Sequence, residues 1–316
     1  MILKVTSLLL CSCLLALRLM AQQTAHVLHV SGQVEYYAQH AAKPVLLSPG
    51  MELDMKGKVR CKGTASAKLL SNGRTIVVSG SKMRDLQALA ATNAGESNAG
   101  FTGRFLNFVE ESVQESDSEE KLKKQHRKYM NKASGGVKGY ANQANAITPL
   151  LLASGKLPLA LVTFQWRKAA GDGPYTFSLL VPGGKPVVQL LVLDTAITLD
   201  LKQLALNPDE GYEWSITRGS TAKSAAMPVE ISPQSMEAAQ NSISRVPYYS
   251  SALPFERQLM LAYTYEEDNC YYGANQVYAA LLSAEPNNPL LRRLYAAFLA
   301  RMDMLPEAIA LVPSGN

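Results

Sequence analysis

The sequence predicts a multidomain protein with an all-β N-terminal domain, a linking helix, a β-sandwich and C-terminal α-helical hairpins, in that order. Two segments contain short alternating apolar runs separated by Gly, Asn and Pro turns, the pattern of half-buried strands. A highly charged amphipathic segment lies between them, and the last part of the chain has a helical period. A chain of 316 residues is also longer than one hydrophobic core usually organises.

The domain boundaries are placed where these patterns change. The expected segments are a signal peptide over 1–21, the β domain over 22–87, a linker and amphipathic helix over 88–156, the sandwich over 157–232 and the helices over 233–316.

Residues 1–21 have the pattern of an export signal. Lys4 precedes an apolar stretch that is too short to span a bilayer comfortably, and Ala21 offers a cleavage site. Cys13 leaves lipidation open as an alternative, although an apolar segment follows it where a polar tether is expected. We therefore expect a mature chain that is periplasmic or secreted and does not span the membrane. Its net charge of about +3 indicates no particular partner.

Residues 57–80, "GKVRCKGTASAKLLSNGRTIVVSG", raise the question of a phosphate-binding loop. No helix pattern follows the glycines, as it would in such a loop. Asn72 and Gly73 instead tolerate the positive φ angles that a two-residue hairpin requires. The stretch is therefore expected to be a run of short strands joined by turns.

This β segment resembles the FecR-type periplasmic domain. The resemblance lies in "VSGQVEYY", "LSPGMEL" and the following hairpin pattern, on Gly32, Gly50, Leu53, Val59, Gly63, Ala67, Leu69, Gly73 and Leu86. It implies a periplasmic β domain. Regulatory members of that family carry a cytoplasmic segment and a membrane span before the domain, whereas an export signal is expected here.

Basic residues gather on one expected strand of this domain. The side chains of Lys58, Arg60 and Lys62 alternate with apolar ones and should project from one face. With Lys68, they are our candidates for binding an anionic protein or glycan of the cell envelope. A charged edge that prevents strand aggregation is the favoured alternative. Nucleic acid is not an expected partner, because no aromatic residues are interleaved with these cations.

Residues 88–103 are small and polar and are expected to form a linker, followed by one helix over about 104–133. The acids of that helix precede its cations, an order that complements the helix dipole. Its charged face is expected to be solvated, with a partner-binding helix as the alternative.

The strands expected over 157–232 recur at the spacing of a small sandwich. The placement of Trp166, Tyr175, Leu204, Tyr212 and Trp214 is similar to that in fibronectin type III and immunoglobulin-like modules. Both tryptophans are expected to anchor the core rather than to stack on a sugar.

The C-terminal region resembles the tetratricopeptide repeat. Counting from Phe255 places Leu261, Ala262, Tyr265, Ala274, Tyr278 and Pro286 on that family's positions, and a truncated second unit from Pro289 places Ala296 and Ala308. Two such units rarely fold alone, so the pair should lean on the sandwich or on another subunit. The resemblance implies a concave protein-binding surface, for which Tyr265, Tyr272 and Arg292 are the candidate residues.

The sequence contains few groups for catalysis. No zinc-protease, serine-hydrolase, paired-cysteine or nucleotide-binding motif occurs. On a regular strand His26 and His29 would point to opposite faces, and His126 is expected to be a packed histidine. Cys61 and Cys270 are expected to be free buried thiols, with pairing as the alternative. We therefore expect no cofactor, no metal and no enzyme, because polar residues are used on turns, caps and exterior faces.

The expected function is that of a non-catalytic exported envelope protein, a scaffold that binds a protein or a glycan. A sensor or regulatory component that signals to a membrane partner is the first alternative. An uncharacterised hydrolase is the second, and a hollow lined by converging carboxylates would favour it.

Overall fold

The computed structural model describes residues 24–92, 100–133, 147–168, 173–220, 222–233 and 235–312. The chain divides into two compact units, residues 1–98 and 99–316. The expected signal peptide lies outside the described residues. Within the described part of the chain, no helix has both the length and the apolar character needed to cross a membrane. The predicted N-terminal β region and C-terminal helical region are confirmed.

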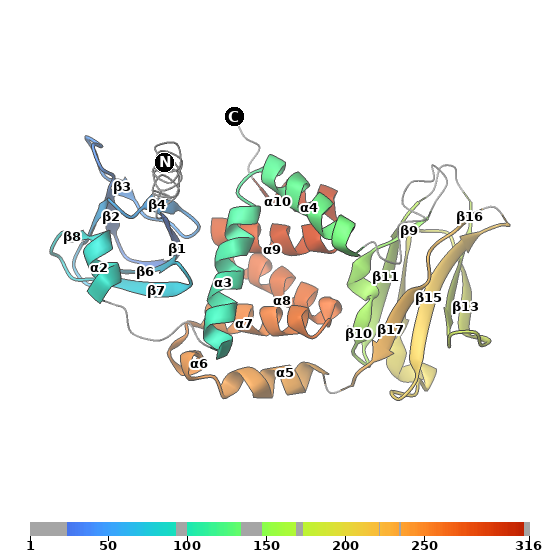
Figure 1. Ribbon diagram of the computed structural model, residues 1–316. Helices are drawn as coiled ribbons and strands as arrows, with labels where there is room; N and C mark the ends of the chain where they lie inside the picture. The colour runs from blue at the N-terminus through green and yellow to red at the C-terminus, as the bar shows by residue number, and fades with distance from the viewer. Residues whose placement is uncertain are drawn as a thin grey trace, which may run out of the picture. The chain divides into compact units, whose positions relative to one another are not determined.

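The first unit consists of two antiparallel four-stranded sheets and a short helix (Figure 1). One sheet has the order β4 (Glu52–Asp54), β1 (Thr24–Ser31), β6 (Ser66–Ser71) and β7 (Arg74–Ser79). The other has the order β3 (Val45–Leu46), β2 (Val34–Tyr37), β5 (Lys58–Cys61) and β8 (Arg84–Asp85). Asn72 and Gly73 have φ angles of 51° and 64° between β6 and β7, so the hairpin prediction is confirmed.

A bulge in β1 corrects the prediction for the two histidines. His26 lies opposite Leu70 and His29 lies opposite Lys68, because the register shifts between Val27 and His29. Residues 68 and 70 are two apart on β6 and share a face. His26 and His29 therefore lie on the same face of the sheet, since the extra residue cancels the alternation on which the prediction relied.

The expected linker and single helix are also corrected. Residues 88–92 belong to α2 (Leu86–Thr92), whose Leu86 and Leu89 are buried in the core of the first unit. Within residues 100–133 the chain forms two helices, α3 (Gly100–Glu115) and α4 (Glu119–Ala133). The chain turns between them, and the Ser118 hydroxyl accepts a hydrogen bond from Lys121 N. Both helices pack against α9, so this segment is part of a packed helical layer rather than a solvated connection.

Two sheets in the second unit enclose an apolar core. The larger sheet has the order β10 (Gly155–Leu157), β17 (Met227–Ile231), β15 (Gly211–Arg218), β12 (Tyr175–Leu180) and β13 (Pro186–Val192), and β16 (Ala222–Lys223) pairs with β15. The smaller sheet has the order β14 (Ala196–Asp200), β11 (Leu161–Arg167) and β9 (Thr148–Pro149). Two short 3₁₀ helices, η1 (Leu151–Ala153) and η2 (Leu201–Leu204), complete this two-sheet region.

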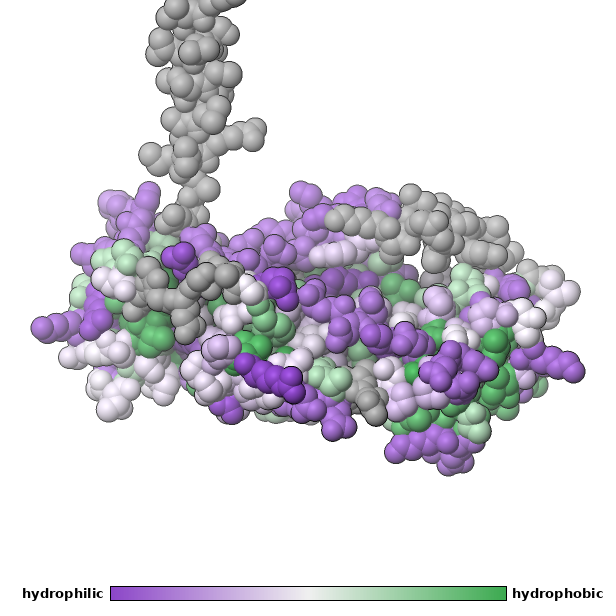
Figure 2. All heavy atoms as spheres, turned by 60° about the horizontal axis from the view of Figure 1, so that its bottom comes forward, coloured by the Kyte–Doolittle hydropathy of each residue, from purple (hydrophilic) through white to green (hydrophobic). Residues whose placement is uncertain are grey.

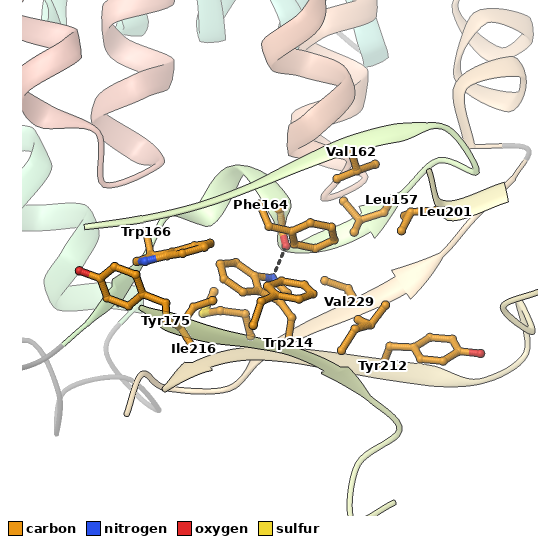
Figure 3. Close-up of a cluster of buried hydrophobic side chains, with 14 of the residues drawn as sticks. Leu157, Val162, Phe164, Trp166, Tyr175, Leu201, Tyr212, Trp214, Ile216 and Val229 are labelled. Carbon is orange, nitrogen blue, oxygen red and sulfur yellow. Dashed lines mark hydrogen bonds between the residues drawn. The ribbon is translucent and has the colours of Figure 1, made fainter. Parts of the chain in front are cut away.

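Aromatic side chains fill the space between these sheets (Figure 3). Trp214 is fully buried, and its indole N–H donates to the Ala153 carbonyl at 2.7 Å. Phe164 and Phe177 pack against it at ring distances of 5.4 and 6.0 Å. Trp166 is also buried, so the prediction that both tryptophans anchor the core is confirmed.

Strand β13 exposes its outer side chains. Leu191 is 71% exposed, and Leu193, directly after the strand, is 84% exposed; Figure 2 shows apolar surface at this end of the second unit. Pro186 and the register shift beside it interrupt pairing at the start of the strand, which limits edge-to-edge association.

The helical part of the second unit is a layer of packed helices (Figure 1). After α5 (Ser235–Ser244) and α6 (Pro247–Ser251) come α7 (Pro254–Glu267), α8 (Tyr271–Ala284), α9 (Pro289–Arg301) and α10 (Leu305–Leu311). Consecutive members of this second group pack together. The four alanines expected at close helix contacts, Ala262, Ala274, Ala296 and Ala308, are fully buried.

The helical layer is joined directly to the two-sheet region. Lys156 N donates to the Asn269 carbonyl at 2.9 Å, and a Cβ at Gly155 would collide with that carbonyl. On the other side, Asp303 accepts from His126 Nε2 at 2.7 Å and pairs with Arg167 at 3.4 Å. His126 is thus a packed histidine, and its partner is distant in the sequence. The helices lean on the sheets, as predicted for the short repeat pair.

Candidate functional site

The second unit contains a polar cavity of about 550 Å³ among its helices. Helices α3, α4, α7, α8 and α9 and the 3₁₀ helix η1 all contribute to its wall. The lining residues are Phe108, Glu111, Ser112, Glu115, Tyr129, Met130, Leu151, Tyr263, Glu266, Glu267, Tyr271, Arg301 and Met302. This volume is typical of small-ligand sites, which span roughly 300–1,000 Å³. The expectation that polar side chains gather in no shared hollow is therefore wrong.

One stripe of α3 forms a wall of the cavity. Phe108, Glu111, Ser112 and Glu115 are spaced by three, one and three residues, so they lie on one helix face. The adjacent stripe, which includes Phe105 and Val109, is buried and fixes the helix against its neighbours. The packing of α3 therefore turns the polar stripe toward the cavity.

A buried ion pair forms the floor of the cavity. Arg301 Nε and Nη2 donate to the two carboxylate oxygens of Glu266 at 2.8 and 2.9 Å, and the side chains are only 11% and 9% exposed. Tyr278 also donates to Glu266, at 2.9 Å. Burial raises the pKa of Glu266, while Arg301 acts in the opposite direction. The bidentate geometry supports a charged pair, in which the carboxylate offsets burial and raises the pKa of Arg301.

A second polar contact ties α4 to α3. The Tyr129 hydroxyl lies 3.0 Å from both oxygens of Glu115 and donates to this carboxylate. Burial raises the pKa of Tyr129 to about 12, so the phenol stays protonated at neutral pH. Glu115 also lies 4.0 Å from Arg301. The carboxylates of Glu115 and Glu266 are thus held by hydrogen bonds within the protein.

Four carboxylates occupy the C-terminal ends of two helices. Glu115 is the last residue of α3 and Glu111 lies one turn before it, and Glu266 and Glu267 are the last two residues of α7. Neither of these described helices has a basic residue in its last turn. A helix C-terminus carries partial negative charge, which disfavours acids by roughly 0.3–1 kcal/mol each. Two negative helix ends therefore converge on the cavity.

Aromatic rings form the rest of the polar cavity's wall. The rings of Phe108 and Tyr263 are 4.9 Å apart and tilted by 46°. The guanidinium of Arg301 lies over the Phe108 ring at 5.0 Å from its centroid. The Tyr271 hydroxyl donates a hydrogen bond to Asn269 Oδ1 at 2.7 Å. The cavity thus combines carboxylates with π faces.

The candidate basic residues of the first unit lie elsewhere. Lys58, Arg60 and Lys62 alternate with buried Val59 and Cys61, as predicted. However, Arg60 and Lys62 pair with the same carboxylate, Glu35, at 2.6 and 2.7 Å.

Glu35 partly neutralises this basic face. Hydrogen bonds from Lys62, Arg60 and Tyr37 lower the pKa of Glu35 to about 2. Lys68 lies on β6, in the other sheet, so the structure does not place the four cations on one strand.

The three candidate groove residues make contacts within the second unit. Tyr265 is buried at 2% exposure, and burial raises its pKa to about 12. The Tyr272 hydroxyl donates to the Leu161 carbonyl of the two-sheet region at 2.9 Å. Arg292 Nε donates to the Leu311 carbonyl at 2.8 Å.

Sequence reasoning missed the polar cavity because it depends on contacts between distant segments. Glu115 and Arg301 come from opposite ends of the second unit. A local signal was nevertheless present, since acids at helix C-termini break the usual charge preference. Cys61 and Cys270 are both buried thiols that form no disulfide in the described part of the chain, as predicted. Among the described residues, no three His, Cys, Asp or Glu side chains are grouped so that they could hold a metal ion.

Comparisons with known proteins give no family for this chain. No family model matches the sequence, and no curated protein matches it.

Proposed function

We propose that this protein is a non-catalytic exported envelope protein that binds a protein partner, with the polar cavity as the binding site. The first unit would be a FecR-like domain, the two-sheet region an immunoglobulin-like sandwich, and α7–α10 a tetratricopeptide-like pair. In this proposal the cavity takes the place of the concave groove, whose candidate side chains are used internally.

One observation carries this proposal. The most enclosed acids of the cavity are held by Arg301, Tyr278 and Tyr129, so they are fixed as parts of the wall. A general acid or base needs access to the proton that it transfers. A preformed cavity with fixed polar groups and aromatic faces is instead suited to binding.

The test begins with a random-peptide display library panned on the mature chain, residues 22–316. The selected peptides are then measured by fluorescence anisotropy against Phe108→Ala and Phe101→Ala. Both residues are half-buried on α3 and contact Tyr263, but only Phe108 lines the cavity. We expect Phe108→Ala to weaken binding at least tenfold, because truncating an aromatic residue at the centre of a binding site typically costs about 2 kcal/mol of binding free energy. Phe101→Ala should bind normally.

Equal binding by both variants, or no selected peptide, would contradict the proposal. A glycan array on the same proteins separates the two partner classes. Glycan capture that is lost in Phe108→Ala would replace the protein partner with a glycan.

A second candidate function, hydrolysis, is favoured by the convergence of carboxylates on one hollow. Glu111 and Glu267 are exposed and would be the acids that reach a substrate. Turnover of chromogenic glycosides or peptides that is abolished in Glu111→Gln or Glu267→Gln would favour this function over binding. We expect no turnover by the unaltered protein.

A further inference from the structure

We propose that the polar cavity recognises a cationic group, namely a lysine or arginine side chain of the protein partner. This inference rests on the proposed function and specifies the chemistry of the ligand. Three independent features support it: the charges of the lining residues, the orientation of two helices and the aromatic wall.

The lining residues carry an excess of negative charge. They include four glutamates and one basic residue, Arg301, whose guanidinium is already paired with Glu266. At the rim, Arg104 and Glu267 both interact with the Tyr263 hydroxyl. Among the described residues, the contacts that compensate the charge of Glu115 are Arg301 at 4.0 Å and the Tyr129 phenol. An arriving cation would balance charge that the protein leaves uncompensated.

The two helix ends strengthen this effect. The backbone carbonyls of the last turn of α3 and of α7 add partial negative charge where their four glutamates are placed. Two other helices of the layer, α4 and α9, have charges that follow the stabilising rule. Helix α4 begins with Glu119 and Glu120, and α9 carries Arg301 in its last turn. The two helix ends that carry acids both lie at the cavity, a local conflict of the kind that proteins tolerate at functional sites.

The aromatic wall is suited to a cation. Arg301 already stacks over one face of Phe108, which demonstrates that this environment favours a cation next to a ring. Tyr263 and Tyr271 provide further rings next to Glu267 and Glu266. The aliphatic stem of a lysine or arginine would pack on these rings while its charge reaches the carboxylates.

The arrangement favours an organic cation over a metal ion. The glutamates come from two different helices, and no three acidic, histidine or cysteine side chains of the described residues are grouped for metal ligation. A volume of about 550 Å³ accommodates a whole side chain and its neighbours, whereas a bare ion needs a tight cage of oxygens.

The test pairs two double variants with the same change of net charge. Glu111→Gln/Glu267→Gln alters the cavity, whereas Glu110→Gln/Asp268→Asn alters the neighbouring positions, which do not line it. Each is titrated with Nα-acetyl-lysine amide and Nα-acetyl-norleucine amide, followed by NMR shifts of the full mature chain. Selected display peptides are measured in parallel, with each lysine or arginine replaced by norleucine.

We expect the lysine probe to bind at least tenfold tighter than the norleucine probe, since ion pairing and cation–π contact together contribute about 1.4 kcal/mol or more. The cavity variant should lose this preference and the neighbour variant should keep it. Increasing salt should weaken lysine binding in the unaltered protein.

The inference is overturned if the norleucine forms bind as well, or if both double variants behave alike. If peptides without a basic residue bind in the cavity, the inference of a cationic ligand is wrong, whereas the proposed binding function is still supported. If calcium displaces the lysine probe, or if glucosamine binds more tightly than this probe, the ligand of the cavity is a different cation and the proposed lysine or arginine side chain is wrong. Failure of all peptides at the cavity would overturn the proposed function itself.

Discussion

The core of the two-sheet region and the polar cavity of the helical layer belong to the same compact unit, yet they are built on opposite rules. Between the sheets, Phe164 and Phe177 pack against Trp214, and the indole N–H is satisfied by a backbone carbonyl. Among the helices, a charged pair and several hydroxyls surround a hollow. The first arrangement buries as much apolar surface as possible. The second leaves polar side chains accessible around the cavity.

Local preferences agree with the fold in one region and conflict with it in the other. In the two-sheet region the apolar residues of β11 and β15 alternate with polar ones, as half-buried strands require. In the helical layer, acids lie at helix ends that repel them. Since natural proteins concentrate such conflicts at functional sites, the contrast supports the polar cavity as the proposed binding site.

The largest effect is expected from breaking the apolar core. Trp214→Ala should lower the free energy of unfolding by about 3–5 kcal/mol, because a large side chain and its hydrogen bond are lost. Guanidinium denaturation followed by circular dichroism measures this change. Leu191→Ala on exposed β13 is the control and should change stability by less than about 0.5 kcal/mol. A small effect of Trp214→Ala would mean that this core does not hold the unit together.

The second effect comes from the ion pair. Arg301→Met should destabilise the unit by about 3 kcal/mol, because Glu266 would be left as a buried charge without its partner. Arg301→Met/Glu266→Met should recover much of this loss, since it removes both charges. The same denaturation assay measures both variants. If the double variant is no better than the single one, the pair contributes through packing rather than charge.

The first unit offers an ion cluster near its surface for comparison with the buried pair. The pKa of Glu35 is lowered from 4.5 to about 2, so its contribution to stability is complete above pH 4.5. This contribution should disappear as the pH falls toward 2. Thermal melts of the first unit, followed by NMR signals of β2 and β5, should show this loss, and Glu35→Gln should remove that part of the pH dependence. An unchanged profile in Glu35→Gln would show that the cluster does not stabilise the fold.

The same contrast explains what could be predicted from the sequence. Strand patterns, the turn at Asn72 and Gly73, and the buried tryptophans depend on neighbours in the chain, and they were predicted correctly. The break between α3 and α4 was missed because the amphipathic stripe continues across the turn at 116–118. The position of His26 and His29 on the same face of the sheet was not predicted, because the spacing of residues in the sequence does not reveal a β-bulge.

The polar cavity could not be predicted for a different reason. Its wall requires the end of α3, the end of α7 and the end of α9 to meet, and tertiary packing alone decides that meeting. Candidate residues chosen by local pattern, such as Tyr265 and Arg292, were instead used to close the fold. The charge conflict at the helix ends is the one local feature that pointed to the site.

The smallest expected effect is also the most discriminating between the two regions. Glu111→Gln and Glu267→Gln should each stabilise the protein by about 0.3–1 kcal/mol, because each removes an acid from a helix C-terminus. No single substitution of a buried residue in the two-sheet core should increase stability, because the apolar residues of that region already occupy the positions that its strands bury. Urea denaturation at low salt measures the gain, and high salt should reduce it. A loss of stability on either substitution would mean that these acids support the fold, and that the negative cavity is a by-product of packing.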